Sequence, residues 1–182
     1  MGFRLVLLLS LALPVAAAEV AGVKIEDKTR VADTELSLSG AGLRRRAFFQ
    51  VYAVGLYVQD RKADPIFQPG PKRVQIHMLR DVGADTFTEA LADGIKANHS
   101  EAETKALEPR VKQLGATIAE IKEAKKGMII ALDWNASATQ VVIDGKPAGQ
   151  PIEGEDFYRA LLKIWLGDKP VQDDLKKALL GA

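Results

Sequence analysis

The feature that most limits how this chain can fold is residues 48–58, which are apolar at even and odd positions alike. Successive side chains of a β-strand point to opposite faces, so such a strand must be covered on both sides. Three consecutive arginines, Arg44, Arg45 and Arg46, precede it. Cationic side chains rarely enter a core without an anionic partner. We therefore expect the strand to line an apolar cavity with a few polar points, and the arginines to meet either a ligand or solvent.

Residues 1–18 have the pattern of a secretory signal peptide. Arg4 supplies the positive start, residues 5–13 the apolar run, and residues 16–18 the small side chains of a cleavage site. The apolar run is too short for a membrane span of about 20 residues. We expect cleavage near Ala18 and a periplasmic protein that has no stable membrane span. An uncleaved anchor is the alternative.

The composition of the remaining chain, residues 19–182, restricts its partners. One of the 25 basic residues, Arg4, lies in the signal, which leaves 24 basic against 24 acidic residues and no global charge to attract nucleic acid. The chain has no cysteine, which excludes disulfides, thiol catalysis and thiolate metal sites. His77 and His99 have no neighbouring side chains at ligand spacing. We expect one domain with no metal and no cofactor.

Strand patterns dominate the first half of the chain and return after the middle. They cover residues 20–25, 35–39, 48–58, 73–80, 128–133, 139–143 and 146–150. The pair Asp144-Gly145 predicts a two-residue hairpin turn between the last two segments.

Helical patterns cover residues 85–95, 107–121, 157–165 and 171–180. Residues 86–89 match a capping box at the start of the first helix, and Pro109 should kink or restart the second. This order predicts an α+β fold, in which a connected antiparallel sheet carries helices on one face.

Three stretches together resemble the chalcone isomerase-like family, in particular its exported bacterial branch. They are Gly-Ala-Gly-Leu-Arg at 40–44, Val-Tyr-Ala-Val-Gly-Leu-Tyr at 51–57, and residues 157–167 with Pro170 after them. The resemblance spans nearly all of the chain after the signal. It implies an open-faced β-sandwich, a large antiparallel sheet with a helical layer and a ligand cleft between them. The family includes enzymes that close chalcones, non-catalytic fatty-acid binders, and bacterial members of unassigned activity.

The resemblance also implies roles for individual residues. Arg44 matches the arginine that stabilises developing negative charge in the enzymes and meets the carboxylate in the fatty-acid binders. Tyr52 stands where the enzymes have a cleft threonine, and a tyrosine there is typical of the binders. Phe87 and Gly94 stand where the enzymes have a catalytic tyrosine and an asparagine. Both lack the polar atoms of those groups, so the resemblance implies that most of the catalytic set is missing.

The residues themselves leave two interpretations of Arg44 open. In the first, it is a cation of the cleft that pairs with a ligand carboxylate, and strand parity supports this by placing it on the side of Leu36 and Leu38 if no bulge intervenes. In the second, it belongs to a solvated hairpin tip. Arg45 and Arg46 are expected at the surface, because adjacent arginines usually face water. Arg80 ends the apolar face of the strand at 73–80 and is a weaker second cation for the cleft.

We thus predict a ligand site made of Arg44, Tyr52, Arg80 and Phe87, with no catalytic residue. The expected function is non-catalytic binding of an apolar carboxylate such as a fatty acid. One alternative is an isomerase or intramolecular lyase that acts on a conjugated carbonyl compound. Another is a periplasmic interaction protein without a small ligand.

Overall fold

The computed structural model describes residues 17–182. The basic start and apolar run of the predicted signal peptide lie outside the described residues, so export and cleavage near Ala18 stay predictions. Within the described part of the chain, no helix is long and apolar enough to cross a membrane.

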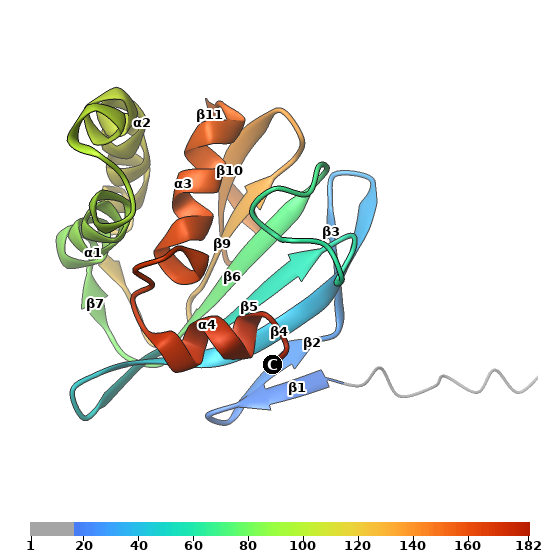
Figure 1. Ribbon diagram of the computed structural model, residues 1–182. Helices are drawn as coiled ribbons and strands as arrows, with labels where there is room; N and C mark the ends of the chain where they lie inside the picture. The colour runs from blue at the N-terminus through green and yellow to red at the C-terminus, as the bar shows by residue number, and fades with distance from the viewer. Residues whose placement is uncertain (1–16) are drawn as a thin grey trace, which may run out of the picture.

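A curled antiparallel sheet forms the centre of the molecule (Figure 1). Its strand order is β11-β10-β9-β6-β5-β4-β3. The strands are β3 (Lys28–Val31), β4 (Thr34–Arg46), β5 (Phe49–Val58), β6 (Lys72–Met78), β9 (Ile129–Trp134), β10 (Ala138–Ile143) and β11 (Lys146–Glu153). Two short ladders pair β1 (Ala17–Val20) with β2 (Val23–Glu26), and β7 (Val82–Gly83) with β8 (Glu123–Ala124).

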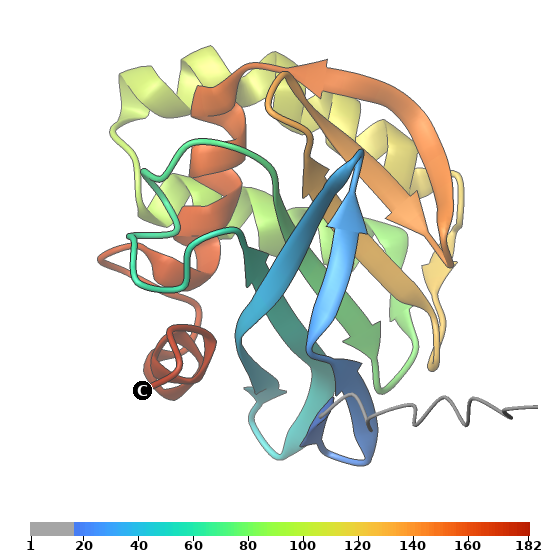
Figure 2. The ribbon, with the colours of Figure 1, turned by 90° about the vertical axis from the view of Figure 1, so that its right-hand side faces the viewer.

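The helices cover one face of this sheet, as predicted for an open-faced α+β fold. They are α1 (Ala84–Ala97), α2 (Glu101–Ala119), α3 (Glu155–Leu166) and α4 (Asp173–Leu179). In Figure 2 the dark-blue strands β1 and β2 lie at the front, at one end of the sheet, whereas α1 and α2 lie behind the sheet. The fold therefore has three layers around β5.

Strand β5 is buried on both faces from Tyr52 to Val58, as its sequence predicts. Its even-numbered side chains join the main core under the helices, and its odd-numbered ones join a second cluster. That second cluster includes Ile25 of β2 and Leu36 and Leu38 of β4. The beginning of the predicted strand differs, because Phe48 lies in the turn before β5 and is fully exposed.

Two predicted element boundaries are wrong. The segment 20–25 is split between β1 and β2 by a turn at Ala21-Gly22, where both residues have positive φ. The proposed capping box at 86–89 lies inside α1, which begins at Ala84. The chain is already held there, because the Ala84 amide donates to the carbonyl of Lys122 at 2.9 Å.

A capping box does begin the next helix, at Ser100 and Glu103. The helix α2 then continues past Pro109 without restarting, contrary to one of the two outcomes expected. The strands β9, β10 and β11 form the predicted meander, and Asp144-Gly145 turns with φ of 48° and 79°, as a two-residue hairpin turn requires.

The Gly-x-Gly of β4 lets helix α4 lie directly on the sheet. A side chain at position 40 would collide with the backbone carbonyl oxygen of Ala178. A Cβ at position 42 would lie 2.6 Å from Cδ1 of Leu175. The two glycines thus determine how closely α4 approaches β4.

We predict that Gly40→Ala is more damaging than Gly42→Ala. The first change meets only backbone atoms of α4, which can move only with the helix. The second meets the flexible end of Leu175 and, at 2.9 Å, the Cβ of Ala178, so it requires a smaller shift of α4. Overpacking of this kind costs about 1–3 kcal/mol of unfolding free energy. Urea denaturation of both variants measures the difference. Equal stability of Gly40→Ala and the wild type would contradict the packing role.

Candidate ligand-binding site

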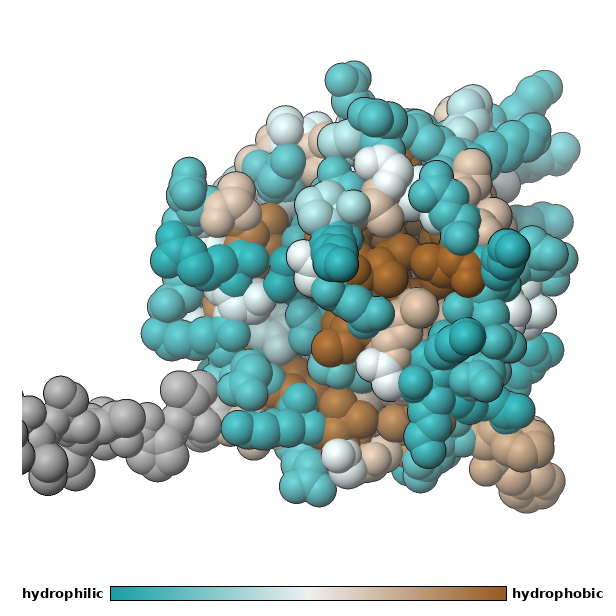
Figure 3. All heavy atoms as spheres, turned by 180° about the vertical axis from the view of Figure 1, so that it is seen from behind, coloured by the Kyte–Doolittle hydropathy of each residue, from teal (hydrophilic) through white to brown (hydrophobic). Residues whose placement is uncertain are grey.

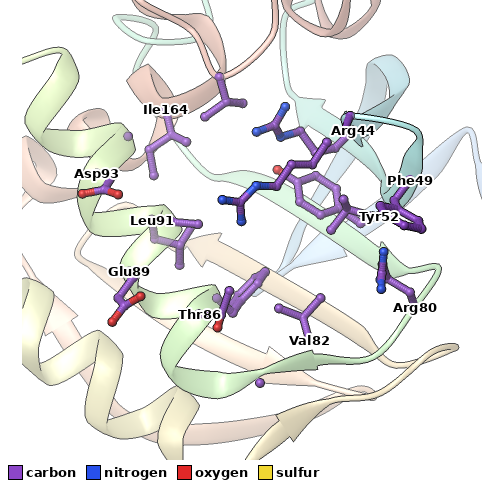
Figure 4. Close-up of a pocket in the computed structure, with 18 of the residues that line it drawn as sticks. Arg44, Phe49, Tyr52, Arg80, Val82, Thr86, Glu89, Leu91, Asp93 and Ile164 are labelled. Carbon is purple, nitrogen blue, oxygen red and sulfur yellow. The ribbon is translucent and has the colours of Figure 1, made fainter.

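A cavity of about 980 Å³ lies between one end of the sheet and helix α1 (Figure 4). The β4–β5 hairpin forms one wall, α1 the opposite wall, and the chain between β6 and α1 the floor. Ile164 of α3 and the segment 169–171 complete it. All four predicted site residues, Arg44, Tyr52, Arg80 and Phe87, line this one cavity. Ligand binding by them stays a prediction.

A β-bulge between Leu38 and Gly40 places Arg44 at the cavity, whereas the prediction from strand parity assumed a strand without a bulge. Leu38 pairs with Tyr57 on the outer side of β5, but the register shifts before Gly40, which pairs with Leu56 on the inner side. From there on the even positions of β4 face the helices. Arg44 therefore lies on the face opposite Leu38, because the strand is not free of bulges, as the parity prediction required. The bulge itself turns the arginine into the cavity.

The half-buried Arg44 pairs with Tyr52 across the β4–β5 ladder. Its Nη1 donates to the carbonyl oxygen of Arg45 at 2.6 Å and to Oε1 of Gln172 at 3.3 Å. None of the ion pairs among the described residues involves Arg44. Arg45 and Arg46 are exposed, as expected. Arg44 is thus a cation in the cavity without a carboxylate partner in the described chain.

Gln172, the N-cap residue of α4, holds this part of β4 in place. Its Oε1 accepts from the Arg45 amide at 2.8 Å, and its Nε2 donates to the Leu43 carbonyl at 3.0 Å. Strand β3 pairs with β4 only as far as Ser37, so this edge of β4 has no strand partner after Ser37. The side-chain amide of Gln172 bonds to that edge instead. The sequence analysis missed this residue. Its only local sign is a polar residue just before the acidic first turn of a helix.

Tyr52 presents its hydroxyl at the inner end of the cavity. Trp165 donates from Nε1 to that hydroxyl oxygen at 3.0 Å. Burial raises the pKa of the Tyr52 phenol, a shift that the hydrogen bond from Trp165 and the charge of Arg44 partly oppose. The phenol is therefore neutral, and no hydrogen-bond acceptor for its proton exists among the described residues. It is available to donate to a ligand.

The two positions that match enzymatic residues carry no polar side chain. Phe87 is buried in the main core and also lines the cavity. Gly94 lies where α1 crosses α3, and a Cβ there would be 2.7 Å from Cγ2 of Ile164. Helix packing thus excludes an asparagine at position 94 without movement of α3. Packing against Ile164 thus gives a structural reason for a glycine at position 94.

Arg80 lies at the rim of the cavity rather than beside Arg44. Its guanidinium stacks 4.5 Å from the centre of the exposed Phe49 ring (Figure 4). Glu89 and Asp93 of α1 lie at the far wall, opposite Arg44. The site is therefore cationic on the hairpin side and acidic on the α1 side. In the described part of the chain, no three acidic, histidine or cysteine side chains gather as a metal site would need.

The comparisons with known proteins agree with this architecture. The family model described as chalcone isomerase-like matches residues 17–181, so the chain belongs to that family. A solved structure of a fatty-acid binding protein from Arabidopsis thaliana has a TM-score of 0.70 and 13% sequence identity. The match covers 88% of this chain and 92% of that one, and at this identity it shows a shared fold. The search of curated proteins found no match.

We predict that no tyrosine of the folded protein ionises near pH 10. Burial raises the pKa of all three, to about 12 for Tyr57 and in the same direction for Tyr52 and Tyr158. Because the folded pKa values lie above the ordinary value of 10, folding stabilises the neutral phenols below pH 10. This stabilisation is lost as the pH rises through the folded values. Titration of phenolate absorbance tests this, and an ionisation step near pH 10 with intact circular dichroism would contradict it.

Proposed function

We propose that this protein is an exported, non-catalytic binder of an apolar carboxylate such as a fatty acid. The observation that carries the proposal is the pair of donors at the inner end of the cavity. Arg44 is a cation without a carboxylate partner in the described chain, and Tyr52 has a phenol proton without an acceptor there. A carboxylate satisfies both, because it accepts hydrogen bonds and carries the opposite charge.

Part of the cavity wall suits an alkyl chain. Val51, Phe87, Leu91, Ile164 and Val171 contribute apolar side chains to it. A volume of about 980 Å³ is at the upper end of the range for small-molecule sites. The tail can therefore extend from the Arg44 end along the α1 wall.

The two ends of the ligand contribute unequally to the binding free energy. A hydrogen bond to a charged group contributes about 1.5–3 kcal/mol. Each buried methylene contributes about 0.8 kcal/mol, so a tail of about ten methylenes dominates the affinity. The role of Arg44 is then mainly to orient the ligand, while the cavity wall provides most of the binding free energy.

The fatty-acid binding protein with the same fold supports this proposal, although its binding is a property of that protein. Periplasmic location is supported only by the signal-like pattern of residues 1–18. Fractionation of bacterial cells that produce the full-length chain would test it, and retention of the chain in the cytoplasm would contradict it.

The isomerase alternative rests on Arg44, which could stabilise an enolate or phenolate. Phe87 and Gly94 weigh against it, because neither can hold a reacting hydroxyl or an ordered water. Loss of chalcone faster than in buffer would support it instead. The other alternative is an interaction protein without a small ligand. A cleft filled with side chains would favour it, whereas this chain has an open cavity.

We predict that Arg44→Ala weakens the binding of a saturated fatty acid about 10- to 100-fold, because the charged hydrogen bond is lost. Tyr52→Phe should weaken it by about tenfold or more, because a hydrogen bond from the phenol to a carboxylate is also a bond to a charged group. Isothermal titration calorimetry measures both affinities.

Arg45→Ala is the matched control, since Arg45 is adjacent in sequence but exposed. It should bind the fatty acid like the wild type. The alcohol of equal chain length provides a second control, because Arg44→Ala should change its affinity little. Undetectable fatty-acid binding by the wild type, or equal affinities of the wild type and Arg44→Ala, would reject the proposal.

A further inference from the structure

The apex of the β4–β5 hairpin carries an aromatic side chain that folding does not explain. Arg46 pairs with Phe49, so the turn consists of Ala47 and Phe48 alone. Phe48 is 100% exposed and Phe49 is 58% exposed. Ala47 has a φ of 51°, in the left-handed region that favours glycine. A fully exposed phenyl group at a strained turn adds nothing to the stability of the isolated fold, which points to a contact outside the molecule.

Guanidinium groups surround this apex, in a chain whose formal net charge is only +1. Arg45 and Arg46 precede it and are both exposed. Arg80 lies over the ring of Phe49 at 4.5 Å. Of these three arginines only Arg45 forms an ion pair in the described chain, with the exposed Asp174 at 3.8 Å. The tip is therefore a local combination of aromatic and cationic side chains.

We propose that this tip docks on a membrane that contains anionic phospholipid. Phe48 enters the interfacial region, with Phe49 at its edge, while Arg45, Arg46 and Arg80 lie among the phosphate groups. The shape favours a bilayer over a protein partner. A stable protein interface needs about 800 Å² on each side, which a protruding two-residue turn does not offer. In Figure 3 apolar atoms protrude at the lower right, where the half-turn from Figure 1 brings this hairpin.

Docking at this place would bring the cavity to the membrane surface. Arg46, Ala47 and Phe49 belong both to the tip and to the lining of the cavity. A ligand could then pass between bilayer and cavity without crossing much water. That last link rests on the proposed function, whereas the membrane contact itself rests only on the tip.

Flotation with phospholipid vesicles tests the contact. The probes are phosphatidylcholine vesicles with and without phosphatidylglycerol, mixed with the ligand-free wild type, Phe48→Ser and Phe67→Ser. Phe67 is the matched control, because it is 61% exposed and lies in the loop that follows the opposite end of β5. The wild type and Phe67→Ser should float with the anionic vesicles, and less at high salt. Phe48→Ser should partition at least about tenfold less.

A Phe48→Trp variant reports insertion directly, because Trp134 and Trp165 are both buried. Its fluorescence should shift to the blue with anionic vesicles. No flotation of the wild type, equal flotation of Phe48→Ser, or no spectral shift would overturn the inference. A tip that serves a protein partner would also leave the wild type in the vesicle-free fraction. Fatty-acid affinity, measured on the same preparations, reports the proposed function separately.

Discussion

The burial of β5 on both faces is the constraint on which the other features depend. Helices cover its inner face, and strands β1 and β2 cover its outer face, where Leu36 and Leu38 of the neighbouring strand β4 join the same cluster. Only the start of β5 extends beyond these layers. The cavity forms there, where Tyr52 is the last inner side chain to be buried and Phe49 already meets solvent. The polar site therefore lies at the boundary between a closed core and an exposed hairpin.

A series of packing contacts places Arg44 at this boundary. Gly40 and Gly42 admit α4 onto β4, and α4 places Gln172 against the free edge of the same strand. The bulge after Leu38 then determines which face the arginine takes. The Gly-x-Gly motif thus has an indirect effect on the proposed ligand site: it allows α4 to pack on β4, the strand that carries Arg44.

Local patterns in the sequence predict much of the fold. The two apolar faces of β5 and the Asp144-Gly145 turn depend on neighbouring residues, and both were predictable. The bulge that turns Arg44 inward, the bond from Trp165 to Tyr52, and the fit of Gly94 against Ile164 depend on partners far away in the chain. No local pattern encodes them. The sequence therefore predicted which residues line the site more successfully than how they are held there.

We propose that Arg44 and Tyr52 together receive a ligand carboxylate. Nuclear magnetic resonance of a fatty acid labelled with carbon-13 at its carboxyl group tests it most directly. In the complex with the wild type, the neighbouring cation should keep the carboxyl pKa below its value in the complex with Arg44→Ala. The same carboxyl titration in both complexes, or a carboxyl resonance that matches the ligand free in water, would contradict the account.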